Sequence, residues 1–380
     1  MTANIDDIII VNETELIQTS IDEYFQNKAI VARFENSDLK EGTTFSDSGQ
    51  ETYTSLAGVA EKFPETHIVY KLAQDSFTQK TNTGMNKSAL KKLTVIQIKT
   101  TDASIEAGLN RVGHTDSYLW DLASSDDDDI TSFAAYFGDK RKIPYAQTSE
   151  AEVLTNTQIT PETGEPYDNV AKMLKDANRK IVLYYHEIND EGLHSAESAI
   201  MAFGTTGRIS GVFDKPTGIT VDTLSENQQA KLEENHVNYY TPYIGQAGSY
   251  MTRNLTSGGK MSNGYPIQEQ VILDRTILNL QSAGMDALEM KIPYDDRGGT
   301  MLEGKLQAVL RQLQNEGLFK VDSIADDGTI VKGQSLKVLT TAETQKNFVS
   351  LYTQQMFVAQ AEVVLALNAK KVQINLAYQI

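Results

Sequence analysis

Ile181-Val182-Leu183-Tyr184-Tyr185 is an uninterrupted run of apolar and aromatic residues, and it gives the strongest strand signal in the chain. Short runs of this composition are typical of strands that are covered on both faces of a parallel sheet. Helices are predicted on either side of it, at residues 170–177 and 195–203. This strand therefore belongs to a layered α/β structure if the same alternation continues outward along the chain.

The alternation does continue toward the N-terminus. Strands are predicted at 93–98 and 142–146, a short apolar run covers 118–123, and a polar loop is expected at 147–165. Helices are predicted at 54–63, 68–77 and 103–110, and another opens at the aspartates 126–129. Strands separated by helices of about ten residues need crossover connections, so they form a largely parallel sheet.

A second domain is expected after residues 247–263, which are rich in Gly and Ser and are interpreted as a loop or hinge. It is expected to contain helices at 267–282 and 300–314, an extended step at 291–294, short strands at 328–331 and 336–339, and long strands at 357–368 and 370–380. The predicted fold class is α/β, with a mostly parallel α/β domain, an α+β domain and extended strands at both termini. The expected boundaries are 1–25, 26–246, 247–360 and 361–380.

Both ends of the sequence have the pattern of a strand. The last ten residues alternate polar and apolar, which places Val372, Ile374, Leu376, Tyr378 and Ile380 on one edge. Near the start, Ile8, Ile9, Ile10 and Val11 form a short β-branched run. An unpaired apolar strand favours association with another chain. The alternative is that each end pairs within its own sheet, as most sequential strands do.

Composition excludes several classes of protein. The formal charge is −17, from 34 basic and 51 acidic residues, and no basic patch for direct nucleic-acid binding is evident. The absence of cysteine excludes disulfides and thiolate chemistry. No apolar run reaches the roughly 18 residues of a membrane span, and the acidic N-terminus is unlike a signal peptide. We expect a soluble protein with no membrane insertion.

The sequence does not predict a catalytic, cofactor or metal site. The run Asp126–Asp129 is interpreted as the cap of a helix, since the ligand spacing and glycine of a calcium loop are missing. His186 and His194 lie eight residues apart, not the four of a zinc helix, and belong to a polar cluster with Glu187, Glu191 and Glu197. Residues 204–211 match neither the dinucleotide fingerprint nor the P-loop, and Ser210 lacks the context of a nucleophile elbow.

Several segments resemble the contractile tail sheath proteins of myophage-type phages. They are Thr52-Tyr53-Thr54-Ser55-Leu56-Ala57-Gly58-Val59-Ala60, Phe63-Pro64, Tyr70, Phe77-Thr78-Gln79, and Arg179 to His186. The most specific part runs from Gly218-Ile219-Thr220-Val221-Asp222-Thr223-Leu224-Ser225 to Asn235-His236-Val237-Asn238-Tyr239-Tyr240, which is similar to a sheath turn, helix and Asn-Tyr-Tyr strand. Val221 stands where the family often has proline. The resemblance spans residues 52–313.

The resemblance implies a structural homo-oligomer without enzymatic activity or cofactor, located in the virion tail and assembled in the host bacterial cytoplasm. Subunits would form stacked rings or a helical tube around a tail tube protein, between baseplate and tail terminator proteins. The arms at 7–11 and 363–380 would add strands to neighbouring subunits. Residues 26–246 would lie outside and 247–360 would face the tube, where Arg275, Asp295, Asp296 and Arg297 are candidate contacts. Contraction would drive the tube through the target envelope.

Two alternatives follow from the same residues. One is an α/β enzyme or nucleotide-binding protein with its ligand at the carboxyl ends of parallel strands, near Asn189 or Gly204. The other is a tail or baseplate component that shares the sheath contacts but does not contract. Turnover or tight nucleotide binding by a monomer would favour the first alternative.

Overall fold

The computed structural model describes residues 21–79, 90–113, 115–138, 140–161, 165–202, 211–245, 248–325, 329–353 and 355–366. The predicted terminal strands at 7–11 and 370–380 lie outside these residues, and so do residues 204–210. Contacts between residues divide the chain into two compact units. Among the described residues, the N-terminal unit comprises 21–202 and 211–268, and the C-terminal unit comprises 269–366.

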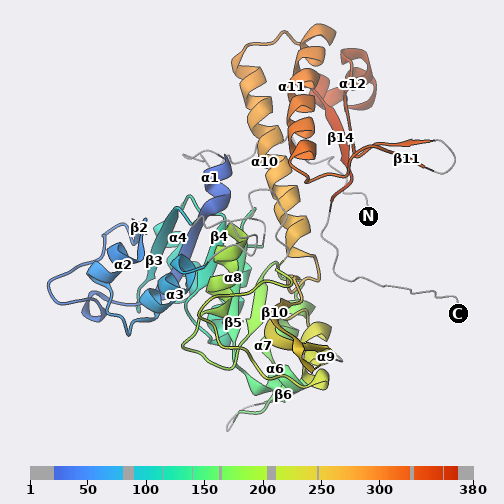
Figure 1. Cartoon of the computed structure of the whole chain (residues 1–380). Coiled ribbons are helices and arrows are strands. Elements are labelled where there is room, and N and C mark those ends of the chain that lie inside the picture. Colours follow the sequence, from blue (N-terminus) through green and yellow to red (C-terminus); the bar gives the residue numbers. More distant parts are fainter. Residues whose placement is uncertain are drawn as a thin grey trace, which may run out of the picture. The chain divides into compact units, whose positions relative to one another are not determined.

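The N-terminal unit is built on a six-stranded sheet in the order β2-β3-β1-β4-β5-β8 (Figure 1). Its strands are β1 (Asn27–Arg33), β2 (Gln50–Tyr53), β3 (Lys92–Ile98), β4 (Leu119–Leu122), β5 (Ile143–Thr148) and β8 (Val182–Tyr185). All neighbours are parallel except β2, which pairs antiparallel with β3 at one edge. The predicted α/β fold with a mostly parallel sheet is confirmed.

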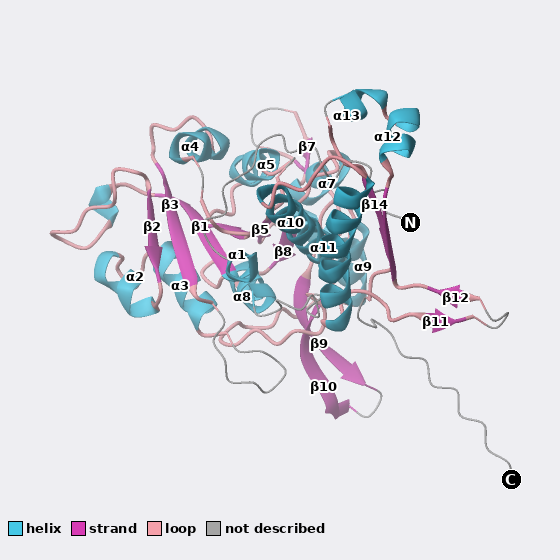
Figure 2. Ribbon diagram, turned by 90° about the horizontal axis from the view of Figure 1, so that it is seen from above, coloured by secondary structure: helices cyan, strands magenta, loops and turns pink. Residues whose placement is uncertain are grey.

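Helices cover both faces of this sheet, as Figure 2 shows. One face carries α3 (Ile68–Phe77) and α8 (Leu193–Ala202), with α2 (Leu56–Lys62) against α3. The other carries α4 (Ile105–Val112), α5 (Asp127–Tyr136) and α7 (Val170–Asp176). The alternation of side chains along each strand therefore supplies two separate cores.

The two cores differ in polarity. On the α4/α5/α7 face the strands contribute apolar side chains such as Val31, Ile96 and Trp120, which pack in one hydrophobic cluster. On the opposite face the register places Lys28 and Asp121 on neighbouring strands beneath α8. Both side chains are fully buried. The face under α8 thus contains a buried pair of opposite charges.

Smaller elements complete the N-terminal unit. They are α1 (Ile21–Gln26), a 3-10 turn (Asn36–Asp38), α6 (Ala151–Thr155), β6 (Gln158–Ile159), β7 (Tyr167–Asp168), α9 (Glu226–Glu234), β9 (Tyr239–Gly245) and β10 (Gly248–Ser257). Asn238, just before β9, bonds through its backbone to Leu183 and Tyr185 of β8. The root of the β9–β10 hairpin is therefore attached to the sheet.

The C-terminal unit is an α+β structure. It holds most of α10 (Ile267–Glu289), then α11 (Asp296–Asn315), β11 (Ser323–Ile324), β12 (Ile330–Val331), β13 (Gln334–Val338), α12 (Thr341–Asn347), α13 (Val349–Thr353) and β14 (Ala359–Val363). Leu306 and Leu310 of α11 pack with Ile272 of α10 and with Val338 and Ala361 of the β13–β14 pair. Two helices and a two-stranded sheet thus share one core.

Several predictions about individual elements are wrong. Residues 248–257 are a strand and not the predicted loop: β10 pairs antiparallel with β9, because the glycines lie at its ends and the residues between them are strand formers such as Tyr250 and Thr252. Residues 258–263 do form loop and turn, as predicted. The segment 147–165 contains α6 and β6. The sequence reading also missed β1, the central strand, and the helices α12 and α13.

The predicted domain boundary at 246/247 differs from the division by contacts. Residues 248–268 belong to the N-terminal unit, and the division falls between Gln268 and Glu269. Because β10 pairs with β9, residues 248–257 extend the N-terminal unit instead of opening a new one.

Candidate functional site

The connection order of the parallel strands marks one edge of the sheet as a potential ligand site. In chain order the parallel strands are β1, β3, β4, β5 and β8, and in space they run β3-β1-β4-β5-β8. The chain therefore changes direction across the sheet between β1 and β4. In open α/β sheets, ligands bind at the carboxyl ends of the strands near such a switch point.

The arginines at this edge are already paired with carboxylates. Arg33, the last residue of β1, contacts Asp129 with Nη2 2.8 Å from Oδ1. Arg111 contacts Asp102, which follows β3, with Nη2 2.8 Å from Oδ2. These guanidinium groups tie α5 and the β3–α4 loop to the sheet, and their pairing makes them poor receptors for a phosphate.

The aspartate run after β4 caps a helix, as the sequence predicts. Asp126 accepts hydrogen bonds from the backbone N–H groups of Asp128 and Asp129, at 3.0 and 3.1 Å. Asp127 lies beside Glu150, and burial together with this second carboxyl raises the pKa of Asp127 to about 8. Burial raises the pKa of Glu150 as well, and the helix N-terminus is occupied by the chain's own acids.

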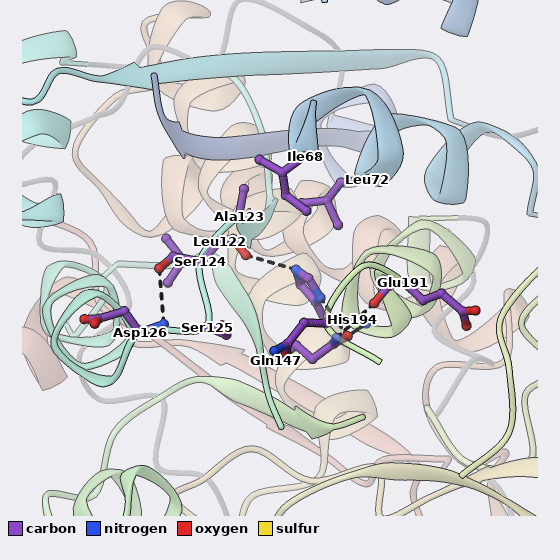
Figure 3. Close-up of a pocket in the computed structure, with 11 residues that line it drawn as sticks. Ile68, Leu72, Leu122, Ala123, Ser124, Ser125, Asp126, Gln147, Glu191 and His194 are labelled. Atoms are coloured by element: carbon purple, nitrogen blue, oxygen red, sulfur yellow. Dashed lines mark hydrogen bonds between the residues drawn. The ribbon is translucent and has the colours of Figure 1, made fainter. Parts of the chain in front are cut away.

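A cavity of about 330 Å³ opens at the carboxyl ends of β4 and β5 (Figure 3). Its wall combines the aliphatic residues Ile68, Leu72, Leu122 and Ala123 with the polar residues Ser124, Ser125, Asp126, Gln147, Asn189, Glu191 and His194. Asn189, near which a ligand was expected under the enzyme alternative, lines this cavity. No lysine or arginine is among the described residues of its wall.

His186 joins two segments that are distant in sequence. Its Nδ1 lies 3.0 Å from Oδ1 of Asp222, and its Nε2 lies 3.3 Å from Oε2 of Glu191. Burial lowers the pKa of His186, but the hydrogen bonds and charges of the two carboxylates outweigh this and raise it. Glu191 in turn accepts hydrogen bonds from the backbone and hydroxyl of Thr220. His186 therefore links the loop after β8 to residues 218–240, the segment whose sequence resembles the sheath pattern.

His194 occupies a different environment, although it lies in the same predicted polar cluster. It is the second residue of α8 and is 4% exposed, and its Nε2 lies 3.1 Å from the carbonyl oxygen of Leu122. Burial lowers its pKa to about 4, so the ring is neutral at pH 7. Its Nδ1 lies 3.3 Å from Oε1 of Gln147. The two histidines do not form one site.

The sequence reading missed the buried lysine network beneath α8. The Lys28 ammonium pairs with Asp121 and donates to Ser76 Oγ at 2.6 Å and to Ser195 Oγ at 2.8 Å. A lysine next to two serines can activate a nucleophile, but Lys28, Ser76 and Ser195 are at most 1% exposed. The signal available in the sequence was a lysine directly before the apolar run at residues 29–32.

The candidate interface charges have separate roles. Arg275 is 4% exposed, and its Nη2 lies 2.8 Å from Oε2 of Glu316, so it holds α10 against the end of α11. Asp295 caps α11 through the N–H of Gly298, and Asp296 accepts from the N–H and hydroxyl of Thr341. Arg297 is exposed. The strand-arm residues lie outside the described part of the chain.

No group of three or more His, Cys, Asp or Glu side chains among the described residues is arranged to hold a metal ion. No helix in the described part of the chain is long and apolar enough to cross a membrane.

Comparison with known proteins gives a weak structural likeness and no match by sequence. No protein-family model and no curated protein matches this chain. The crystal structure of the sheath tail protein Lin1278 from Listeria innocua is similar over 85% of this chain and 96% of that one, with a TM-score of 0.46 and 9% sequence identity. A likeness of this size is too weak to support an inference about function.

Proposed function

We propose that this chain is a structural subunit of a contractile tail sheath, which polymerises around an inner tail tube and contracts to drive the tube through a cell envelope. It would act without enzymatic activity, in the virion tail, with tail tube, baseplate and tail terminator proteins as partners. Contraction would need no nucleotide, because the extended assembly is metastable and new contacts between subunit bodies release the energy.

The observation that carries the proposal is the segment from Gly218 to Tyr240. Its residues resemble the sheath pattern of a turn, a helix and an Asn-Tyr-Tyr strand. In the structure Gly218 has a φ of 84°, α9 follows at Glu226–Glu234, and Tyr239 and Tyr240 open β9 as buried residues. The local structure thus agrees with the pattern that the residues suggest.

The sheet of the C-terminal unit offers edges for the proposed arms. Among the described residues β13 and β14 form a sheet of two strands, so no third described strand pairs with either edge. A strand added to an open edge of this sheet would gain main-chain hydrogen bonds. We propose that arms from neighbouring subunits, at 7–11 and 367–380, complete such a sheet. The first residues of the expected C-terminal arm instead pair within their own unit: Val363 pairs with Gln334, and residues 364–366 bond through their backbone to residues 318–320 and 333, so the proposed arm begins after residue 366.

Exposed apolar side chains in the C-terminal unit also favour an assembly. Around the β11–β12 hairpin, Val321 and Ile324 are 74% and 75% exposed, and Ile330 is 64% exposed. Contiguous exposed aliphatic surface of this kind marks protein contacts. We propose that this unit faces the tube and that the N-terminal unit lies outside. Arg297 is a candidate contact there, whereas Arg275 is assigned to the fold.

The test compares two substitutions on opposite faces of the same predicted strand. Ile374→Asp places a charge on the apolar edge of the C-terminal arm, and Gln373→Asp places the same charge on its polar edge. We expect Ile374→Asp to abolish the fraction of protein that sediments as polymer, and Gln373→Asp to retain at least half of that fraction. The two should differ because alternate side chains set the register of an added strand. Truncation after Asn368 should act like Ile374→Asp.

The result against the proposal would be equal polymer formation by both variants and by the truncated chain. Charge reversal of Arg297 that leaves co-assembly with the tube unchanged would remove that residue from the interface.

The cavity at the switch point supports the alternative of a ligand-binding α/β protein, which tight nucleotide binding by the monomer would favour. Polymers that never contract would identify a non-contracting tail or baseplate component.

A further inference from the structure

Glu197 on α8 is a buried acid without the partners that usually stabilise a carboxylate. The residue is 3% exposed, and its Oε1 has no hydrogen-bond partner among the described residues. Its Oε2 accepts a long hydrogen bond from the hydroxyl of Tyr184, at 3.5 Å. No lysine, arginine or histidine in the described part of the chain pairs with it. Because a buried carboxylate without a cation or strong donors is very unfavourable, Glu197 keeps its proton in the folded protein.

The titratable groups that interact with Glu197 are themselves acids. Asp214, which is 8% exposed, acts on it through its charge. Burial, and then the charge of Glu197, raises the pKa of three tyrosines: Tyr145 of β5, Tyr184 of β8 and Tyr240 of β9. Their hydroxyls are neutral at pH 7, so they offer Glu197 no positive charge.

Charged groups on the elements around α8 have partners of their own. This helix packs against α3, β1, β4, β5 and β8. Lys28 of β1 pairs with Asp121 of β4, and Asp75 of α3 accepts the backbone N–H of Gly192. His194, on α8 itself, is neutral at pH 7 because burial lowers its pKa to about 4. These groups therefore do not neutralise a charge on the buried acid of α8.

The N-terminal end of α8 is held on the sheet by hydrogen bonds. The ammonium of Lys28 donates to the backbone carbonyl and the Oγ of Ser195, at 2.6 and 2.8 Å. Nε2 of His194 lies 3.1 Å from the carbonyl oxygen of Leu122. Glu197 follows Ser195 by two residues in the same helix, so it cannot move toward water unless these contacts break.

The segment 211–214, which carries Asp214, is held less firmly. Phe213 donates its N–H to the carbonyl oxygen of Thr256 at 2.9 Å, and Asp214 exchanges two bonds with the same threonine, at 3.0 and 3.1 Å. Phe213 is 43% exposed and has a φ of 65°, in the left-handed region that strains a bulky residue. Of the two sides that enclose the acids, this segment is therefore the one that yields.

We propose that Glu197 and Asp214 form a pH-sensitive switch that controls the pairing of residues 211–214 with Thr256 of β10. While Glu197 keeps its proton, the segment stays closed. When Glu197 loses the proton, repulsion between the two carboxylates separates the segment from Thr256 and lets water reach the charge. The switch is independent of the sheath proposal, since all of these residues lie in the N-terminal unit.

The direction of the pH effect follows from the two acids. Burial, and then the charge of Asp214, raises the pKa of Glu197 well above its ordinary value of 4.5, and burial raises the pKa of Asp214 to about 7. In the open segment Glu197 is hydrated and titrates near its ordinary value. Above that value the open form releases a proton that the closed form keeps. Opening therefore becomes about tenfold more favourable with each pH unit, until Glu197 ionises in the closed form as well.

The test measures hydrogen exchange of the Phe213 N–H in the full-length protein, corrected for the intrinsic effect of pH on exchange. In the natural protein we expect the protection of this N–H to fall at least about a hundredfold between about pH 6 and pH 8. In Glu197→Gln, whose side chain has the same size and no proton to lose, the fall should be at least about tenfold smaller. The control is Glu226→Gln, in the exposed first turn of α9, which should behave like the natural protein.

Constant protection of the Phe213 N–H in the natural protein would overturn the proposal, and so would an equal fall in Glu197→Gln. If Glu197→Gln does not fold, Asp214→Asn decides instead. It removes the repelling charge, so its fall in protection should also be at least about tenfold smaller than in the natural protein. A fall as large as that of the natural protein would show that the two acids do not control this segment.

Discussion

Lys28 is fully buried on β1, and its charge is balanced by Asp121 on the neighbouring strand β4. Desolvation lowers the pKa of Lys28, while the charge and hydrogen bond of Asp121 oppose that effect. The ammonium therefore depends on its partners, which are Asp121 and the serines of α3 and α8. This network connects both helices of one face to the centre of the sheet.

Removing the carboxylate from this pair should strongly destabilise the N-terminal unit. We expect Asp121→Asn to lower the free energy of unfolding by about 3–5 kcal/mol, because it leaves a buried charge uncompensated. Asp129→Asn is the control: its partner Arg33 is 33% exposed. That variant should cost no more than about 1 kcal/mol. Urea unfolding followed by circular dichroism measures both, and equal losses would show that Lys28 is neutral or hydrated.

His186 should make the stability of the same unit depend on pH. Its folded pKa is raised above 6.5 by Asp222 and Glu191. A raised histidine pKa stabilises the fold fully below the unfolded value of 6.5, and this contribution is lost as pH rises through the folded pKa. The unfolding midpoint of the natural protein should therefore fall from pH 6.5 upward by more than that of His186→Gln. Parallel curves for the two proteins would contradict the assignment.

At the scale of single elements, α11 contains a pair of glycines with opposite requirements. A Cβ at Gly298 would lie 1.8 Å from the carbonyl oxygen of Pro293, which is backbone and cannot move away easily. At Gly304, in the same helix, no heavy atom lies within 4 Å of the added carbon. Because Gly298 has no Cβ, the residues before α11 can pack closely on the helix. Gly304 makes room for no neighbour, so its only effect is to lower the helix propensity of α11.

Alanine should therefore have opposite effects at these two positions. Gly298→Ala should destabilise the C-terminal unit by about 2 kcal/mol or more, since the clash forces the backbone to shift. Gly304→Ala should stabilise it by about 0.5–1 kcal/mol through helix propensity. Hydrogen exchange of the α11 amides in the full-length variants reports both changes. Stabilisation by Gly298→Ala would show that residues 293–298 pack differently.

Helices and strands whose apolar side chains follow a single period could be predicted from the sequence. Elements that combine apolar residues with buried polar residues or glycines could not. The strand at 93–98 and the helix at 68–77 agree with β3 and α3 because their side chains follow one period. β1 was missed because its apolar run, residues 29–32, is short and follows Asn27 and Lys28, whose burial depends on partners far along the chain. β10 was not predicted because the glycines at its ends are typical of a loop, whereas the residues between them form a strand that pairs with β9.

The candidate site was predictable only in part. His186, Glu191 and His194 stand out in the sequence as a cluster, and Asp126 as a cap. Asp222 is 36 residues away from His186, and Gln147 is 47 residues away from His194. These pairings are set by the order of strands in the sheet, which local periodicity does not encode. The cavity therefore appears only when the fold is known.

The whole molecule comprises two compact units, and we propose that terminal arms link copies of it. The sequence pattern at residues 370–380 and the two-stranded β13–β14 sheet are independent observations that favour strand addition. A head-to-tail contact that does not close into a ring produces a helix of subunits, as a sheath requires.

The most direct test of the central claim is electron microscopy of the purified full-length chain at increasing concentration, with and without tail tube protein. We expect striated tubes from the full-length chain and only monomers after truncation at Asn368. Monomers in every sample, including those with tail tube protein, would contradict the proposal that this chain is a sheath subunit.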